Sequence, residues 1–580
     1  MGDPGAVVVD GLRRDGVGRG DPVALAFAPG VGLGLATSVG RRLSVGTDSG
    51  DPVAAVRHVE DELRPRWVLW STDTALALVR AGLRVATCWD LAATHRLLFG
   101  GWRAEPARVW ARLHDLPLDA LPTTQPLDLF SPPEDGDAVR PDGHLSAEWV
   151  NGGWAESLDR LERWAELAVV ATSLQQARLD ERPRAAATAR AESAAELLCA
   201  EMSVDGLPVD RSVAEAMLVE IVGPRPKSPT EAAQARAERD DQVLCHAPAD
   251  SRFDLRSPGQ VKSLLRRVGI EVPDTRAWRL EALRDAHPLV DALLAWRKAE
   301  RVATTYGYAW LDENLGADDR LRGAWSSADG AAGRMTASAG LHNLPADMRG
   351  AVVAEAGHVF VRADLGQIEP RVLAAVSGDR ALARATRADD MYAPMAEHLG
   401  VDRATAKVAM LGAMYGQTTG HGAQVLRRLT SAYPVAMEYL SDGDRSGQMG
   451  RDLRTYGGRL VRMGGGGGGG ADGASEQEAR SRAAARGRYG RNALVQGAAA
   501  ELFKVWAVTV RARGAELGAQ IVLCLHDELL VHVAADRGDA AARLLEDCLQ
   551  EAAHRWAPDD RVRFVADIGV ISRWSDAKGD

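Results

Sequence analysis

The stretch from His358 to Arg380, which reads HVFVRADLGQIEPRVLAAVSGDR, limits the possible folds of this chain more than any other. Its apolar start at residues 359–361 predicts a short buried strand. Apolar residues at helical spacing then predict a helix that includes Ile368, Val372, Leu373 and Val376. Asp364 stands at the turn between the two elements. A carboxylate held there could bind a metal ion, although capping the helix requires the same residue.

A second stretch, Ile521–Val533, reads IVLCLHDELLVHV and places an apolar run on each side of His526, Asp527 and Glu528. This pattern predicts a tight β-hairpin with acids at its tip, or more simply a polar turn. Two acid-tipped strands in one chain indicate a pair of carboxylates that converge on a divalent metal. Oxygen ligands suit Mg²⁺, which also binds substrate phosphates.

A third stretch, residues 403–416, lies between the first two and reads RATAKVAMLGAMYG. Arg403, Lys407, Leu411 and Tyr415 recur every four residues, which places them in one stripe along a helix. In chain order, ADLGQIEPRVLAAVSGD, RATAKVAMLGAMYG and LCLHDELLV resemble the first carboxylate motif, the nucleotide-binding helix and the second carboxylate motif of family A DNA polymerases, the bacterial DNA polymerase I type. The resemblance covers roughly residues 190–577 and implies template-directed DNA synthesis.

The resemblance implies a nucleotidyl transfer in which a primer 3′ hydroxyl attacks the α-phosphate of a dNTP. Asp364 and Asp527 would bind two Mg²⁺ ions, with Mn²⁺ as a substitute, and Glu528 would support them. Lys407 and Arg403 would neutralise the triphosphate as charge builds up. The catalytic residues expected on this basis are Asp364, Asp527, Glu528 and Lys407.

The same resemblance implies a nucleotide site made of Gln367, Glu369, Tyr392, Arg403, Lys407, Leu411 and Tyr415. Glu369 would crowd the 2′ position of the sugar and so favour dNTPs over rNTPs, and Tyr415 would stack in the template–nucleotide pocket. Two positions depart from the family pattern. Tyr392 replaces a histidine that helps to bind triphosphate, and Leu411 replaces an aromatic residue that packs against the sugar. These departures predict an altered nucleotide affinity or sugar selectivity.

Residues that match the family's DNA contacts lie in GRMTASAGLHNLP, TYGGR and RNALVQGAAAE and at the hairpin tip. They are Arg334, Asn343, Arg459, Asn492, Gln496 and His526. His342 stands where the family usually has glutamine, and Leu494 where it has proline. Phosphate contacts give affinity and register, but a plain surface role remains the alternative for any single arginine.

Residues 1–185 alternate short apolar runs with helical patterns, which predicts an α/β layout. In the family this position holds a 3′–5′ exonuclease domain with four carboxylates around two metals. CWDLAATHRLL resembles its second motif with Asp90 as the acid, but Ala168 stands where the last acid is expected and the apolar strands carry no Asp-x-Glu. We therefore expect an inactive, structural domain in which Asp90 caps a helix. The strands expected here are Val23–Phe27, Trp67–Trp70 and Leu83–Thr87, with a helix at Leu76–Arg80.

The expected fold is multidomain, with an exonuclease-like α/β domain at residues 1–185 followed by an α+β right-hand polymerase. The polymerase parts are a thumb at 186–325, a first palm segment at 326–380, fingers at 381–488 with a glycine-rich loop at 464–470, and a second palm segment at 489–580. No separate 5′-nuclease domain is expected, because the exonuclease-like domain occupies the N-terminal residues.

The composition adds only mild constraints. The formal net charge of −10 counts slightly against a nucleic-acid binder, although one groove can be basic while other faces are acidic. Five scattered cysteines without a CxxC pair indicate neither a zinc site nor a disulfide framework. No signal peptide or membrane span is visible. We expect a cytoplasmic, nucleoid-associated monomer whose partners are primer-template DNA and dNTPs, with a role in replication or repair.

Two other functions stay open. A nuclease that retains 3′–5′ exonuclease activity would use similar metal chemistry, but the missing exonuclease acids and the helix with Arg403 and Lys407 argue against it. A polymerase-shaped DNA-binding protein with weak catalysis is compatible with the changes at Tyr392, Leu411 and His342. The presence of both predicted metal ligands argues against that alternative.

Overall fold

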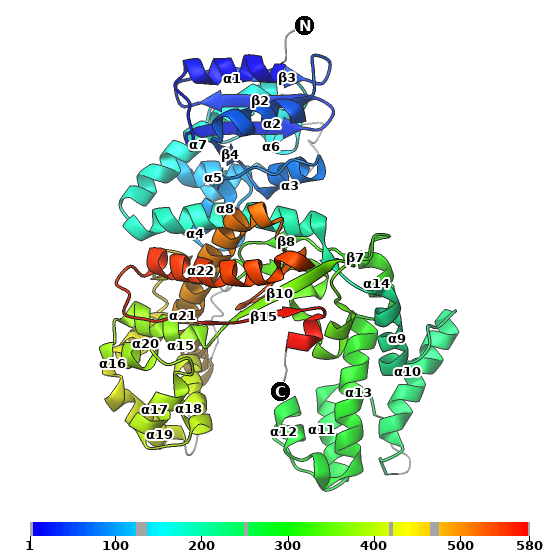
Figure 1. The fold of residues 1–580 in the computed structure, drawn as a ribbon. Helices are drawn as coiled ribbons and strands as arrows, with labels where there is room; N and C mark the ends of the chain where they lie inside the picture. The colour runs from blue at the N-terminus through cyan, green and yellow to red at the C-terminus, as the bar shows by residue number, and fades with distance from the viewer. Residues whose placement is uncertain (1–3, 123–135, 249–252, 417–421, 465–474, 578–580) are drawn as a thin grey trace. The chain divides into compact units, whose positions relative to one another are not determined.

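The computed structural model describes residues 4–122, 136–248, 253–416, 422–464 and 475–577 (Figure 1). The chain forms two compact units. The first unit contains residues 1–206, 324–338 and 356–571, and the second contains residues 207–323, 339–355 and 572–580. Each unit is thus assembled from segments that are distant in the sequence.

The N-terminal part of the first unit is built on a five-stranded mixed sheet in the order β3-β2-β1-β4-β5. β1 pairs with β2, and β2 with β3, in antiparallel fashion, whereas the β1–β4 and β4–β5 pairs are parallel. Both faces of β1 are buried, since its odd-numbered residues pack with α1 and α2 and its even-numbered residues pack with α7. The strands are β1 (Pro22–Ala28), β2 (Gly32–Thr37), β3 (Arg42–Gly46), β4 (Arg66–Leu69) and β5 (Cys88–Asp90).

Helices cover this sheet on both sides (Figure 1). They are α1 (Pro4–Arg14), α2 (Pro52–Leu63), α3 (Thr72–Arg80), α4 (Leu91–Phe99), α5 (Pro106–Leu113), α6 (Ala147–Val150), α7 (Leu158–Asp180) and α8 (Pro183–Asp205). The predictions at Val23–Phe27, Trp67–Trp70 and Leu76–Arg80 are confirmed by β1, β4 and α3.

The strand predicted at Leu83–Thr87 is wrong, because the strand begins only at Cys88. Polar groups of residues 84–86 are bound by side chains instead of a neighbouring strand. The Arg84 guanidinium donates two hydrogen bonds to Asp205, at 3.0 and 2.7 Å. The Ala86 amide donates to Glu60 Oε1 at 2.9 Å. Apolar composition alone could not reveal these side-chain partners.

The second sheet of the first unit has four antiparallel strands in the order β13-β14-β10-β15. These are β10 (His358–Leu365), β13 (Gln520–Cys524), β14 (Glu528–Ala534) and β15 (Ala566–Ile571). The predicted strand before Asp364 and the predicted hairpin around Asp527 are therefore confirmed. Two short pairs, β8 (Trp325–Ser326) with β9 (Thr336–Ala337) and β11 (Leu453–Arg454) with β12 (Leu460–Val461), also belong to this unit.

A helical subdomain with its own hydrophobic core follows β10. It contains α15 (Ile368–Ser377), α16 (Arg380–Ala385), α17 (Tyr392–Leu399), α18 (Arg403–Tyr415), α19 (Gly422–Ala432) and α20 (Pro434–Gln448). α21 (Glu476–Gly514) packs against α20 and against α22 (Gly538–Trp556). A capping box formed by Ser475 and Glu478 starts α21. The boundary predicted between residues 488 and 489 therefore falls inside one continuous helix.

α21 is the only helix among the described residues that is long and apolar enough to cross a membrane. Its most apolar 18-residue window has a mean hydropathy of 1.3, but 83% of that window is buried within the protein. The buried small residues Ala498, Ala499 and Ala500 are typical of this stretch. The apolar surface of the helix is thus used for internal packing.

The second unit is mainly helical and has a separate core. Its elements are β6 (Leu207–Pro208), α9 (Arg211–Val222), α10 (Pro229–Leu244), α11 (Pro258–Arg267), α12 (Ala277–Glu281), α13 (Pro288–Thr305), α14 (Tyr308–Asn314) and β7 (Arg320–Leu321). β6 pairs with β7, which brings the start of the unit next to the segment that follows α14. The unit covers most of the segment predicted as a thumb.

Candidate active site

The acids predicted as metal ligands meet at one end of the four-stranded sheet. In the strand register, Asp364 on β10 lies opposite Glu528 on β14 and opposite Asp567 on β15. Asp527 is at the hairpin tip, where its backbone carbonyl accepts a hydrogen bond of 2.8 Å from the Leu365 amide. Backbone hydrogen bonds therefore fix the end of β10 and the hairpin tip to each other.

Arg362 places its guanidinium among these acids. It precedes Asp364 by two residues and so lies on the same face of β10. Its nitrogens lie 2.5 Å from Asp364 Oδ2, 3.1 Å from Glu528 Oε1 and 3.2 Å from Asp567 Oδ2. Burial acts to lower the pKa of Arg362, but Glu528 and Asp364 outweigh it and raise that pKa. The arginine is therefore fully charged and partly neutralises the cluster.

Even with Arg362 present, electrostatic repulsion between the acids at this end of the sheet opposes their ionisation. Burial and the neighbouring charge of Asp527 raise the pKa of Asp364 to about 6. Burial, together with Glu528 and Glu369, raises the pKa of Asp527. An added positive charge would relieve this repulsion. Because the available donors are carboxylate oxygens, the residues fit a hard divalent cation such as Mg²⁺.

A pocket of about 380 Å³ lies beside the hairpin tip and is lined by the turn into α15, by α17, α18 and α21, and by the tip itself. Small and apolar residues complete its wall, namely Ile368, Pro370, Ala499 and Ala500. The residues predicted for the site that line it are Arg334, Gln367, Glu369, Tyr392, Leu411, Tyr415, Gln496, His526 and Asp527. Segments separated by more than a hundred positions in the sequence thus meet in one cavity.

Two donors hold the carboxylate of Glu369 at the wall of this pocket. Glu369 Oε1 accepts a hydrogen bond of 3.0 Å from Arg334 Nη2, and Oε2 accepts one of 2.5 Å from the Tyr415 hydroxyl. Burial and the hydrogen bond to Glu369 raise the pKa of Tyr415, so its hydroxyl keeps its proton. The Glu369 side chain is 14% exposed. Its orientation is therefore set before any ligand enters.

Gln367 positions the loop before α17. Its backbone is left-handed, with φ of 55°, which is uncommon for a residue other than glycine. The side chain compensates by donating to Asp390 Oδ1 at 2.7 Å and accepting from the Met391 amide at 2.9 Å. Asp390 also accepts a hydrogen bond from Arg403. Burial alone would raise the pKa of Asp390, but Arg403 lowers it, so the pair is ionised.

Of the four residues in the predicted stripe on α18, two line the pocket and two are exposed to solvent. Leu411 and Tyr415 line the pocket, whereas Arg403 and Lys407 are exposed nearer the start of the helix. Tyr392 is 3% exposed, and burial followed by the charge of Glu369 raises its pKa to about 12. The Arg403 guanidinium lies 6.0 Å from the Tyr392 ring centroid. Tyr392 thus offers a neutral ring and hydroxyl where a histidine was expected.

Three predicted DNA-contacting residues lie outside the pocket lining, and one of these predictions needs correction. Arg459 has a side chain that is only 2% exposed and lies 2.7 Å from Glu192, so it is not available to DNA. Its role is structural, within a buried ion-pair network that also includes Lys504. Asn492 is half-buried on α21, and Asn343 is exposed but belongs to the second unit.

Arg362 and Asp567 were missed by reasoning from the sequence. The signal for Arg362 was its two-residue separation from Asp364, which puts both side chains on one face of a strand. Asp567 is 81% exposed and lies outside every motif described from the sequence. Its position opposite Asp364 follows from strand pairing, which composition does not reveal.

Asp90, the predicted exonuclease acid of the N-terminal domain, serves as a helix cap. Asp90 is fully buried and accepts a hydrogen bond of 2.7 Å from the Ala93 amide, so it caps α4. Burial and the nearby Glu196 raise the pKa of Asp90 to about 8. β1 carries no acidic residue, and Ala168 is buried in a core cluster with the stacked rings of Trp70 and Trp164. Apolar side chains fill the region where further acids were expected.

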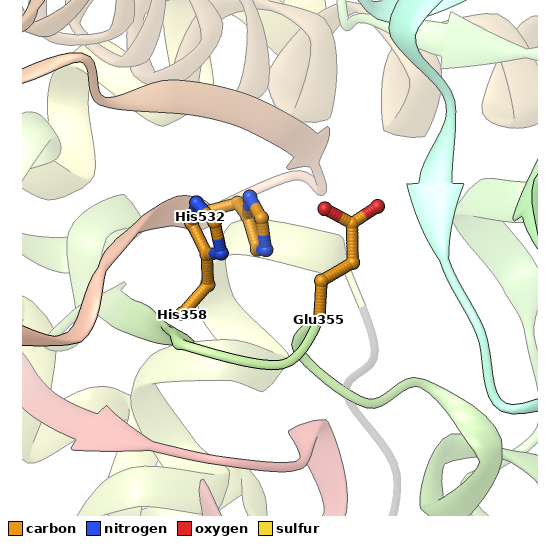
Figure 2. Close-up of side chains that lie close together, drawn as sticks. All are labelled: Glu355, His358 and His532. Atoms are coloured by element: carbon orange, nitrogen blue, oxygen red, sulfur yellow. The ribbon is translucent and has the colours of Figure 1, made fainter.

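The opposite end of β10 carries a different pair of side chains. His358 and His532 stack with ring centroids 4.5 Å apart and an interplanar angle of 12° (Figure 2). Glu355, also labelled there, belongs to the second unit. His358 and Asp364 are six residues apart on the strand, which corresponds to roughly 20 Å. The histidine pair is therefore separate from the acid cluster.

Comparisons with known proteins identify the family of the chain. Residues 228–576 match the sequence profile of DNA polymerase family A. The chain is 30% identical over 329 residues to a thermostable DNA polymerase I of Thermus filiformis, a match that covers 52% of this chain and 38% of that protein. It is 26% identical over 385 residues to DNA polymerase I of Deinococcus radiodurans, covering 59% and 38% respectively.

A solved structure shares the fold over nearly the whole chain. It is the POL domain of Pol1 from M. smegmatis in complex with DNA primer-template and dNTP, with a TM-score of 0.69, 21% identity and 98% coverage of both chains. This likeness confirms the expected multidomain fold. The matches to the two curated relatives span only 38% of their length. Because the family profile matches more than half of its residues, the chain belongs to DNA polymerase family A.

Proposed function

We propose that this chain is a DNA-directed DNA polymerase that adds dNTPs to a primer 3′ end. The observation that carries the proposal is the pocket beside Asp527, in which residues from six separate segments meet next to a cluster of acids. Membership of the family supports the same activity. Primer-template DNA and dNTPs are the partners, as in the complex of the structural neighbour.

Asp364 and Asp527 would hold two Mg²⁺ ions, with Glu528 as a supporting acid. When bound, the metal supplies positive charge that activates the primer hydroxyl and stabilises the leaving pyrophosphate. The protein's own contribution is to hold these acids at a rigid strand end, through the Leu365–Asp527 backbone hydrogen bond. Their raised pKa values support this assignment, because each carboxylate is better stabilised with a cation beside it.

Glu369 would select the sugar of the incoming nucleotide. Its carboxylate is fixed by Arg334 and Tyr415, so it cannot swing aside to accommodate a 2′ hydroxyl. The 2′ hydroxyl is the group that distinguishes an rNTP from a dNTP. Tyr392 is next to this site and buried, so its ring occupies space that a smaller side chain would leave open.

Lys407 and Arg403 would bind the triphosphate from the exposed end of α18. Lys407 is exposed and one helical turn from Leu411, which lines the pocket. Arg403 is held by Asp390, so its guanidinium has a defined direction. Arginine and lysine at this spacing suit a polyphosphate chain.

The N-terminal domain would contribute no proofreading. Asp90 caps α4, and an apolar core surrounds Ala168, which stands where the last acid of a two-metal nuclease site is expected. Synthesis without proofreading is compatible with a repair or replication role. We expect the enzyme to work as a monomer in the bacterial cytoplasm, on the nucleoid.

Primer extension on a labelled hairpin with Mg²⁺ and dNTPs tests the polymerase assignment. Wild type should extend the primer, and Asp527→Asn should lower the rate by at least about a hundredfold, the typical minimum effect of losing an electrostatic catalytic contact. Asp536→Asn is the matched control, because Asp536 is an exposed acid beyond the far end of β14. If wild type binds the hairpin tightly and extends nothing, the chain is a polymerase-shaped DNA-binding protein.

A further inference from the structure

A second pocket, of about 560 Å³, opens in the first unit and shares no lining residue with the candidate active site. We call it the arginine pocket. It is lined by α4, the α4–α5 connection, α5, residues 330–331, the segment that follows β12, and α21. None of its described lining residues is acidic. Its cationic residues are Arg103, Arg108, Arg112 and Arg462.

The positive charge of the arginine pocket is only partly balanced. Burial and then the charges of Arg462 and Arg108 lower the pKa of Arg112, which shows that guanidinium groups crowd together. Glu105 lies 3.4 Å from Arg108, and Asp452 lies 3.6 Å from Arg462, both outside the lining. The remaining excess of positive charge makes the pocket attractive to an anion.

A buried histidine adds an unused polar group to the wall. His95 lines the pocket and is 2% exposed, and its Nδ1 has no hydrogen-bond partner within the described ranges. Burial and the neighbouring arginines, Arg108 first, lower the pKa of His95 to about 3, so its ring is neutral. Buried polar atoms are nearly always paired in native proteins. The unpaired Nδ1 at this cavity wall therefore indicates a bound group that would supply its missing hydrogen bond.

Aromatic rings stand beside the cations. Trp102 is 67% exposed, an unusual position for a large apolar side chain, and the Arg103 guanidinium lies 5.2 Å from its ring centroid. Tyr489 is 40% exposed and lines the same pocket. Alternating guanidinium groups and exposed rings match the chemistry of a nucleic-acid strand, whose phosphates bind arginine and whose bases stack on aromatic rings.

The walls of the arginine pocket are held firmly in place. Gly100 has φ of +69°, and a Cβ there would lie 2.7 Å from the Leu460 carbonyl oxygen. Gly330 has φ of +77°, and a Cβ there would lie 2.6 Å from Trp102 Cβ. Arg462 Nε donates to the Phe99 carbonyl at 2.8 Å. These close contacts fix the loop that carries Trp102, so less ordering is required when a ligand binds.

We propose that the arginine pocket binds single-stranded DNA, with the arginines on consecutive phosphates and Trp102 stacked on a base. The site uses none of the residues assigned to nucleotidyl transfer and requires no catalysis. It therefore goes beyond the proposed polymerase activity and would retain an unpaired strand outside the active site.

Fluorescence anisotropy with the full chain tests this site. The probe is a labelled thymidine oligonucleotide longer than one binding site of ~4–16 nucleotides. Trp102→Ala should weaken its binding about fivefold or more, as expected for loss of one stacked base. Arg103→Gln should reduce the slope of log affinity against log salt by about 0.7, one phosphate contact. Both side chains are exposed, so the fold should be retained.

Arg19→Gln is the matched control, because Arg19 is an exposed arginine of the same unit that does not line the pocket. Affinity for a blunt hairpin duplex should stay unchanged in all three variants, which separates this site from duplex binding at the polymerase site. Cross-linking of a 5-bromodeoxyuridine strand should map to the peptide that contains Trp102. Two results would overturn the proposal: Trp102→Ala and Arg103→Gln behaving like Arg19→Gln, or thymidine monophosphate competing as well as the strand.

Discussion

Replacing Asp90 with asparagine should stabilise the protein at neutral pH and not at acid pH. Asp90 is fully buried, its Oδ1 caps α4 and its Oδ2 has no hydrogen-bond partner among the residues that the structure describes. Asparagine keeps the capping oxygen and puts a neutral group at the second position, as the protonated acid does. The substitution therefore removes the ionisation of Asp90 while leaving its contacts in place.

The magnitude follows from linkage between protonation and folding. Burial and Glu196 raise the pKa of Asp90 to about 8 in the folded protein, against about 3.9 in an unfolded chain. Below pH 4 Asp90 is protonated in both the folded and the unfolded state, so it does not lower the free energy of unfolding. As the pH rises, the unfolded state loses its proton first, so folding stability falls by about 1.4 kcal/mol per pH unit and levels off near pH 8. At pH 7 the accumulated cost is about 4 kcal/mol, which Asp90→Asn would recover.

Urea unfolding of wild type and Asp90→Asn, measured at several values between pH 4 and pH 8, checks this reasoning. The difference in unfolding free energy should grow with pH in favour of the variant. Asp51→Asn is the matched control, because Asp51 caps α2 from an exposed position and should show no such growth. A difference that stays constant with pH would refute the argument, since it would mean that Asp90 ionises in the folded protein as it does in the unfolded chain.

Two further predictions concern the candidate active site. Glu369→Ala should raise rNTP incorporation relative to dNTP incorporation by about tenfold or more, because the fixed carboxylate no longer opposes a 2′ hydroxyl. Competitive single-nucleotide extension measures this ratio. An unchanged ratio would show that Glu369 does not select the sugar. Arg362→Ala should lower the Mg²⁺ concentration for half-maximal extension by at least about tenfold, because the guanidinium competes with the metal for Asp364 by about 1.4 kcal/mol or more. An increase in that concentration would show that Arg362 supports metal binding.

The elements that carry the site could be predicted from the sequence because their patterns are local. The switch from strand to helix periodicity around Asp364 and the two apolar runs around Asp527 correspond to β10 with α15 and to β13 with β14. The strand at Leu83–Thr87 failed because an apolar run forms a strand only when a neighbour pairs with it. There, Arg84 and Ala86 are bonded to distant side chains instead.

The residues that sequence reasoning misplaced or missed depend on contacts between distant segments. Arg459 was read as a DNA contact, but Glu192 on α8 holds it in the interior. Matching a motif identifies a residue type at a position, not its exposure. Asp567 and Asp364 are about two hundred positions apart, and only the pairing of β10 with β15 brings them together. No periodicity in the sequence records that pairing.

Arg362 explains how four acids can share one end of a sheet before any metal binds. Uncompensated buried charges are costly, and the raised pKa values of Asp364 and Asp527 show that the repulsion is only partly relieved. Arg362 contacts two acids at the buried side of the cluster and a third, Asp567, that is 81% exposed. A contact with that exposed acid is worth little to stability. It nevertheless gives the guanidinium a partner in solvent, so Arg362 keeps both Glu528 and Asp567 as partners when a divalent cation binds Asp364.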